Sequence, residues 1–103
     1  MVENSSFPRS PDLMSAADTG LLIIDVQQKL IGLIDGHARI IWNIRRLIDG
    51  AKLLGLPLLA TEQYPQGLGP TSAELLPLLD RVFDKTAFSC GGCAALCHEL
   101  ELS

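Results

Sequence analysis

A carboxylate directly after a buried strand is the residue of this chain best suited to chemistry. The apolar run Leu21–Ile24 predicts a short strand buried on both faces, and Asp25 and Gln27 follow it immediately. In an open parallel sheet, ligands bind outside the carboxyl ends of the strands. Asp25 is therefore a candidate for chemistry. The alternative is a structural acid that accepts hydrogen bonds from loop amides.

A second group of chemically active side chains lies toward the C-terminal end. Cys90, Cys93 and Cys97 are followed by His98, and thiolates with an imidazole suit zinc or an iron–sulfur cluster. Structural zinc sites usually combine two separated ligand pairs, and the sequence has no second pair. On a helix, Cys93 and Cys97 share one face with Leu100, which is typical of a core stripe. We predict free thiols packed in the core, with no metal and no cofactor.

The elements that position these residues begin with a long helix. Asp35 is its expected N-cap, and Gly55 has the place of a glycine that ends a helix. Between them, apolar residues recur at helical spacing: Ile40, Ile41, Ile44, Leu47, Ile48, Ala51 and Leu54. The pattern predicts an amphipathic helix that packs on the sheet.

The other expected elements alternate between strand and helix. They are a strand over 56–61, a loop over 62–70, a helix from Ser72 capped by Thr71 or Ser72, a strand over 81–88 and a helix over 93–102. This order is typical of an α/β fold with right-handed crossovers. We expect a three-layer, Rossmann-like parallel sheet flanked by helices and truncated after the third strand, with residues 1–18 as a disordered tail.

Composition narrows the class of protein. The 103 residues are 48% hydrophobic and 19% charged, as in a globular domain, and the net charge is −4. The eight Lys and Arg residues are scattered, which argues against nucleic acid or an anionic membrane as a partner. No apolar run approaches the roughly 20 residues that span a bilayer. Three cysteines and no apolar leader favour a reducing compartment, so we expect a cytoplasmic protein.

Three segments resemble the isochorismatase-like cysteine hydrolases. Residues 22–27 (LIIDVQ) resemble the first-strand signature of that family, and residues 85–89 (KTAFS) resemble its lysine motif at the end of the third strand. Residues 61–71 (TEQYPQGLGPT) resemble the loop of one branch, the isochorismatase domain-containing proteins. The segments occur in the family's order. The resemblance extends from Thr19 to the C-terminus, which corresponds to the first half of the family's domain.

The resemblance implies a six-stranded parallel sheet and a Cys-Asp-Lys triad. Asp25 would be the general base and Lys85 the cation, and both should converge at the carboxyl edge of the sheet. A nearby cation favours the thiolate of a nucleophilic cysteine, and a carboxylate can take and return its proton. Lys85 could instead be a solvated or salt-bridged side chain. The residues expected to line a substrate pocket are Gln27, Gln63, Tyr64 and Phe88.

The chain departs from the family at two points. The family's nucleophilic cysteine follows the fourth strand, and none of Cys90, Cys93 and Cys97 matches it, so we expect no hydrolysis by this chain alone. The loop after the second strand also lacks the Asp-x-His metal motif of nicotinamidase-like members.

Three functions are therefore open. The first is a hydrolase of a small-molecule amide, ester or vinyl-ether bond, with the nucleophile beyond the end of this chain. The second is a non-catalytic remnant or interaction module, and the third is a thiolate metal or redox protein that uses the cysteine cluster. A small molecule is the expected partner, and a homo-oligomer is left open.

Overall fold

A computed structural model describes residues 14–87 and 89–102 of the chain. Within them, three strands form one parallel sheet in the order β1-β2-β3: β1 (Leu21–Ile24), β2 (Leu58–Gln63) and β3 (Arg81–Lys85). The α-helices are α1 (Gln28–Ile31), α2 (His37–Leu53), α3 (Pro65–Leu68) and α4 (Ala94–Leu102). Short 3-10 turns are η2 (Ala16–Asp18), η3 (Leu76–Leu78) and η4 (Cys90–Gly92). The predicted α/β fold class is confirmed.

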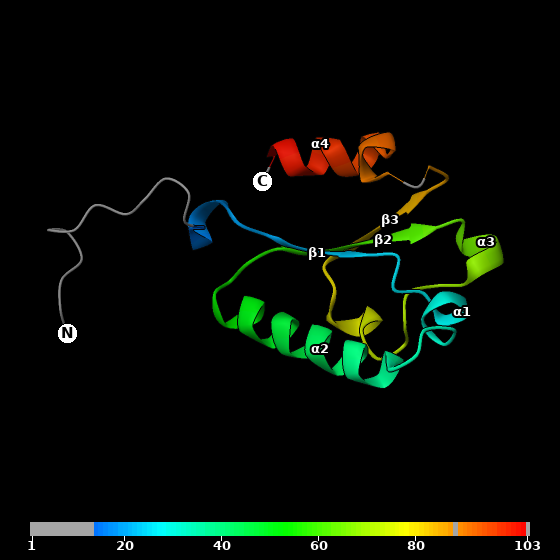
Figure 1. Cartoon of the computed structure of the whole chain (residues 1–103). Helices are drawn as coiled ribbons and strands as arrows, with labels where there is room; N and C mark the ends of the chain where they lie inside the picture. Colours follow the sequence, from blue (N-terminus) through cyan, green and yellow to red (C-terminus); the bar gives the residue numbers. More distant parts are fainter. Residues whose placement is uncertain (1–13, 88, 103) are drawn as a thin grey trace, which may run out of the picture.

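The sheet lies between two helical layers, with α2 on one face and α4 on the other (Figure 1). The first core cluster packs under α2 and consists of Ile23, Ile41, Ile48, Ala51, Leu58, Ala60 and Leu75. The second lies under α4 and consists of Leu59, Phe83, Cys93 and Leu96. Successive β2 residues alternate between the two clusters, as a strand covered on both faces requires. Every β2 residue is buried.

Strand β1 is less buried than its apolar sequence predicts. Only Ile23 is buried, and Ile24 remains 52% exposed. Because β1 pairs only with β2, it forms an edge of the sheet among the described residues. Leu21 and Ile23 pack with the first cluster and Leu22 packs against the second, so both faces of β1 contact the core as predicted, but the burial is incomplete.

The start of the long helix also differs from the prediction. Helix α2 begins at His37, and Gly36 is its N-cap, without a capping side-chain hydrogen bond. Gly36 has a φ of 74°, a left-handed conformation that glycine adopts without strain. Asp35 precedes the cap position and is exposed, so its predicted capping role is wrong. The end is as predicted, since Gly55 follows the helix with a φ of 70°.

The segment from Ser72 does not form the predicted α-helix. The Ser72 carbonyl accepts hydrogen bonds from the N–H groups of Leu75 and Leu76, and only the 3-10 turn η3 follows. Pro77 lies within that turn, lacks an N–H group and cannot continue an α-helical ladder. The prediction of a helix starting at Ser72 is wrong.

Two loop boundaries differ as well. Strand β2 continues two residues into the predicted loop, which also contains the short helix α3, and β3 ends at Lys85, before the predicted residue 88. Of the predicted tail, residues 1–13 lie outside the described part, whereas Ala16–Asp18 form a 3-10 turn whose Ala17 N–H is capped by Ser15. None of the described helices is long and apolar enough to cross a membrane.

Helix α4 buries a different stripe from the predicted one. Cys93 and Leu96 are buried, Cys97 is half-buried, and Leu100 is 48% exposed. The contact with Leu59 and Phe83 on the sheet is thus made by the first turn of the helix. The prediction that Leu100 belongs to the core is wrong.

Candidate functional site

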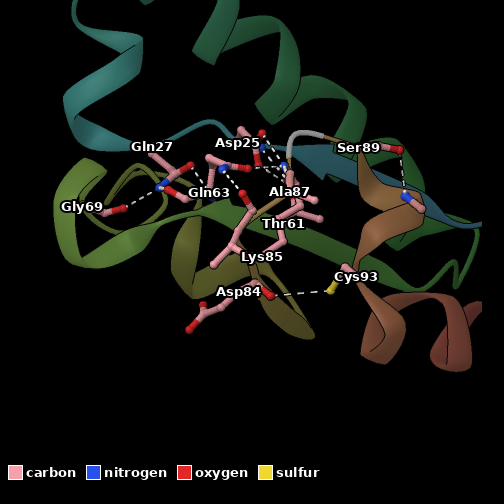
Figure 2. A network of polar contacts seen from close by, with 12 residues as sticks. Asp25, Gln27, Thr61, Gln63, Gly69, Asp84, Lys85, Ala87, Ser89 and Cys93 are labelled. Carbon is pink, nitrogen blue, oxygen red and sulfur yellow. Dashed lines mark hydrogen bonds and ion pairs between the residues drawn. The ribbon is translucent and has the colours of Figure 1, made fainter.

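Asp25 and Lys85 meet at the carboxyl edge of the sheet, as the sequence predicts. Asp25 follows β1, Lys85 ends β3, and β2 lies between them. Lys85 Nζ lies 2.8 Å from Asp25 Oδ2 (Figure 2). The Lys85 side chain is fully buried, and that of Asp25 is 21% exposed. The carboxylate is therefore the member of the pair that solvent can reach.

Asp25 has an unusual backbone conformation. Its φ is 57°, a left-handed value that Asp tolerates better than most residues. Its N–H lies 3.2 Å from both the carbonyl oxygen and Oγ1 of Thr61 on β2. The Thr61 hydroxyl in turn donates to Asp25 Oδ1 at 2.8 Å. The turn after β1 is thus fixed against β2, and the carboxylate points toward Lys85.

The Lys85 ammonium is surrounded by acceptors. Besides Asp25 Oδ2, it donates to Gln63 Oε1 at 2.8 Å and to the Ala87 carbonyl oxygen at 3.1 Å. An ammonium has three donor hydrogens, so these contacts already occupy its hydrogen-bonding capacity. Asp25 is its only acidic partner among these contacts, and the other two partners are neutral.

Gln27, a predicted pocket residue, is fully buried beneath this edge. Its Oε1 accepts from the Gln63 N–H at 2.7 Å, and its Nε2 donates to the carbonyl oxygens of Gln63 and Gly69 at 2.9 and 2.8 Å (Figure 2). These three bonds join the chain after β1 to the end of β2 and to the following loop. In this arrangement the Gln27 side chain is engaged entirely by backbone groups.

Gln63 contacts Lys85 directly, whereas Tyr64 is largely exposed. Gln63 is 9% exposed, and its Nε2 donates to the Thr86 carbonyl oxygen at 2.8 Å. Tyr64 is 56% exposed, with a φ of 40°. Its ring covers Gly67, where an added Cβ would collide with the ring. Phe88, the fourth predicted pocket residue, lies outside the described residues.

A hollow of about 310 Å³ lies beside β3, next to Lys85. Its lining includes Tyr64, Gln66, Lys85, Thr86, Cys93 and Ala94. Tyr64 contributes the exposed aromatic ring, and the first turn of α4 forms another wall. Among Gln27, Gln63 and Tyr64, the predicted pocket residues that the structure describes, Tyr64 lines this hollow.

The cysteines lie on the α4 side of the molecule and are free thiols. Cys93 Sγ lies 3.5 Å from the Asp84 carbonyl oxygen, and Cys97 Sγ lies 3.8 Å from the Cys90 carbonyl oxygen. Within residues 14–87 and 89–102, no three His, Cys, Asp or Glu side chains are grouped to hold a metal ion.

Two features of the site were not predicted from the sequence. The first is the hydrogen bond from the Thr61 hydroxyl to the Asp25 carboxylate. The sequence feature that could have indicated it is a polar residue at the end of an otherwise apolar run. The second feature is the buried carboxylate of Glu62, whose Oε2 accepts from the N–H and the hydroxyl of Thr71. That pair closes the loop between β2 and η3. Its sequence signal is weak, because Thr71 is nine residues away.

Comparison with known proteins identifies the family. The model of the isochorismatase domain matches residues 19–94, which is most of the chain. The chain belongs to the isochorismatase family. The family resemblance inferred from the segments around Asp25 and Lys85 is thereby confirmed.

Individual relatives carry the same family name. Isochorismatase domain-containing protein 2 of Danio rerio is 37% identical over 76 residues, which are 74% of this chain and 39% of that protein. Protein 2B of Mus musculus is 42% identical over 69 residues, which are 67% of this chain and 33% of that protein. This isochorismatase-family chain thus spans less than half the length of these relatives.

A solved structure has a similar fold. It is the MAR1 ribonuclease of Caenorhabditis elegans, with 40% sequence identity and a TM-score of 0.69. The match covers 75% of this chain and 42% of the C. elegans chain. The parallel sheet and its flanking helices therefore correspond to part of an isochorismatase-like fold.

Proposed function

We propose that this chain provides the Asp–Lys part of a cysteine-hydrolase site that acts on an amide, ester or vinyl-ether bond of a small molecule. The observation that carries the proposal is the 2.8 Å contact between Lys85 Nζ and Asp25 Oδ2 at the carboxyl edge of the sheet. Asp25 is the general base, and Lys85 is the cation that balances its charge. The nucleophilic cysteine comes from a further segment.

For an amide or ester, Asp25 removes the proton from the cysteine thiol, and the thiolate attacks the carbonyl carbon. Collapse of the tetrahedral intermediate breaks the bond to the leaving nitrogen or oxygen, which receives the proton from Asp25. Water then hydrolyses the thioester, and Asp25 accepts and returns a proton again. The partial exposure of the Asp25 side chain supports this role, because the base must reach the reacting atoms.

The proposal can be tested in a chimera. Residues 19–94 of this chain replace the corresponding segment of the C. elegans ribonuclease, whose activity provides an assay, and small amides and esters are tested in parallel. We expect an active chimera that loses activity with Asp25→Asn or Lys85→Met. Asp49→Asn and Lys52→Met, on the exposed side of α2, are matched controls. An active chimera that tolerates Asp25→Asn would contradict the proposal and favour a non-catalytic module.

A second candidate function is participation in RNA cleavage. It is favoured by the 40% identity to a protein named as a ribonuclease. The net charge of −4 argues against it, since RNA binding depends on clustered basic residues. Fluorescence anisotropy with labelled single-stranded RNA distinguishes the two functions. Binding by the 103-residue chain that weakens steeply with salt would favour the RNA function.

A further inference from the structure

The carboxamide of Gln63 bridges the end of β3 and the buried ammonium. Its Nε2 donates to the Thr86 carbonyl oxygen, so its Oε1 must face Lys85 Nζ at 2.8 Å. The two contacts fix the orientation of the amide, because only the nitrogen can donate to a carbonyl and only the oxygen can accept from an ammonium. Gln63 thus presents one neutral acceptor to Lys85.

The backbone of Gln63 is itself held on both sides. The Gln27 side chain accepts from the Gln63 N–H at 2.7 Å and donates to the Gln63 carbonyl oxygen at 2.9 Å. Gln27 is fully buried and Gln63 is 9% exposed, so water competes little for these bonds. A connected series of contacts therefore leads from Gln27 through Gln63 to Lys85 and Asp25 (Figure 2).

Lys85 and Asp25, the last two members of this series, differ in what they can still bind. Lys85 donates to at least three acceptors, on Asp25, Gln63 and Ala87, and its side chain is fully buried. Asp25 accepts from Thr61 and Lys85, whereas a carboxylate offers about four acceptor positions. Asp25 can therefore accept a further proton donor, while Lys85 would first have to release a partner.

We propose that Gln63 is a positioning residue that directs the Lys85 ammonium at Asp25 Oδ2, so that Lys85 acts through Asp25 and not on the substrate. The assignment of a catalytic consequence rests on the function proposed above. The placement of Lys85 by the Gln63 oxygen is independent of that function, and this placement can be measured without an activity assay.

The test measures how accessible the Lys85 amine is. The folded 103-residue chain is treated with an amine-acylating reagent, and the modification of each lysine is followed by peptide mass spectrometry. Lys29 and Lys52 are exposed and serve as internal references. We expect Lys85 to react much more slowly than both references in the unaltered chain. Equal rates for Lys85 and Lys52 would overturn the proposal.

Two substitutions of Gln63 distinguish the effect of its acceptor oxygen from the effect of its side-chain volume. Gln63→Met keeps the approximate volume but removes the acceptor, and we expect Lys85 to react at least about tenfold faster. Gln63→Glu keeps an acceptor oxygen for Lys85, and we expect slow labelling to persist. Gln28→Met, at an exposed glutamine of α1, is the matched control and should leave all three rates unchanged.

The labelling rates of Lys85 in the two Gln63 variants support or overturn the proposal. Slow labelling in both Gln63 variants, or fast labelling in both, would overturn the proposal, because the acceptor atom would then not decide the position of Lys85. If Gln63→Met does not fold, the Gln63→Glu variant decides: slow labelling supports the proposal and fast labelling overturns it.

An inactive chimera would overturn the proposed function, but the labelling result would still test the placement of Lys85. In an active chimera, we expect Gln63→Met to lower kcat while KM changes little.

Discussion

Thr61 and Asp25 form a reciprocal hydrogen-bonded pair across the first two strands. The Asp25 N–H donates toward Thr61 Oγ1 at 3.2 Å, and the Thr61 hydroxyl donates to Asp25 Oδ1 at 2.8 Å. Thr61 lies opposite Ile24 in the β1–β2 register, so the pair forms where paired strand becomes turn. One hydroxyl thereby stabilises a left-handed residue and orients its carboxylate.

We predict that Thr61→Val destabilises the chain. Valine keeps the shape but removes both side-chain hydrogen bonds of a fully buried threonine, with an expected loss of about 1–3 kcal/mol in the free energy of unfolding. Urea denaturation of the two proteins measures the difference. Thr86→Val, at an exposed threonine, is the control and should change stability little. Equal losses in both variants would show that the Thr61 hydroxyl has no special role.

Asp25 and Lys85 should show strong energetic coupling. Asp25→Asn removes the carboxylate that lies 2.8 Å from the buried Lys85 ammonium, so we expect this substitution alone to cost about 3–5 kcal/mol. Lys85→Met removes the buried charge itself. The double variant should therefore be more stable than the sum of the two single losses predicts, with a coupling energy of about 1–3 kcal/mol.

A double-mutant cycle by urea denaturation measures this coupling. The exposed pair Arg45 and Asp49, 3.4 Å apart on α2, provides the comparison. Exposed pairs usually contribute less than about 1 kcal/mol. Coupling at Asp25 and Lys85 that does not exceed that of the α2 pair would contradict the prediction.

The meeting of Asp25 and Lys85 could be predicted because it depends on simple rules. Asp25 follows an apolar run, Lys85 lies in a segment that resembles the family's lysine motif at a strand end, and the carboxyl ends of parallel strands lie at one edge of the sheet. The fold class followed from the same alternation of strand and helix. The long helix was predictable from its apolar spacing. Its buried members Ile41, Ile48 and Ala51 all belong to the predicted stripe.

The rest depended on contacts between residues far apart in sequence. Gly36 displaced Asp35 as the cap because its backbone adopts a left-handed conformation, which composition alone does not specify. The three bonds of Gln27 to backbone groups of Gln63 and Gly69 were not predicted, because these partners are 36 and 42 residues away in the sequence. Thr61 was overlooked because its importance arises from a neighbouring strand.

The contact between Glu62 and Thr71 should stabilise the loop after β2. Glu62 is 8% exposed, and its Oε2 accepts from both the N–H and the hydroxyl of Thr71. Glu62→Leu leaves two buried donors without an acceptor, with an expected loss of about 1–3 kcal/mol. Hydrogen exchange should show faster exchange of the Thr71 amide. Glu74→Leu, at an exposed glutamate, is the control, and unchanged exchange at Thr71 would contradict the prediction.

The 103-residue chain by itself should show no hydrolase activity. Among the described residues, the Asp25 carboxylate contacts Thr61 and Lys85, whereas Cys93 Sγ contacts the Asp84 carbonyl oxygen. A base and a cation without a nucleophile form no covalent intermediate, and members of a catalytic triad act as a unit. Assays with small amides and esters measure turnover. Turnover that Asp25→Ala abolishes would refute this prediction, and Cys90→Ser would then test the cysteine nearest in sequence to Lys85.

The final prediction concerns the open edge of β1. Leu21–Ile24 pairs with β2 on one side only among the described strands, and Ile24 is 52% exposed. Unpaired backbone groups beside exposed aliphatic side chains promote pairing with another chain. We therefore expect the 103-residue chain to associate as its concentration rises, in a way that light scattering detects.

A charge at this edge should oppose that association. Ile24→Lys places an ammonium beside the unpaired strand, and we expect a monomer at concentrations where the unaltered chain associates. Leu33→Lys is the control, because Leu33 is 83% exposed but lies in the loop between α1 and α2. If both substitutions reduce scattering equally, general charge and not the strand edge controls association. A monodisperse monomer whose Leu21–Ile24 amides are strongly protected from exchange would refute the prediction altogether, because an open edge strand leaves outward-facing amides to water.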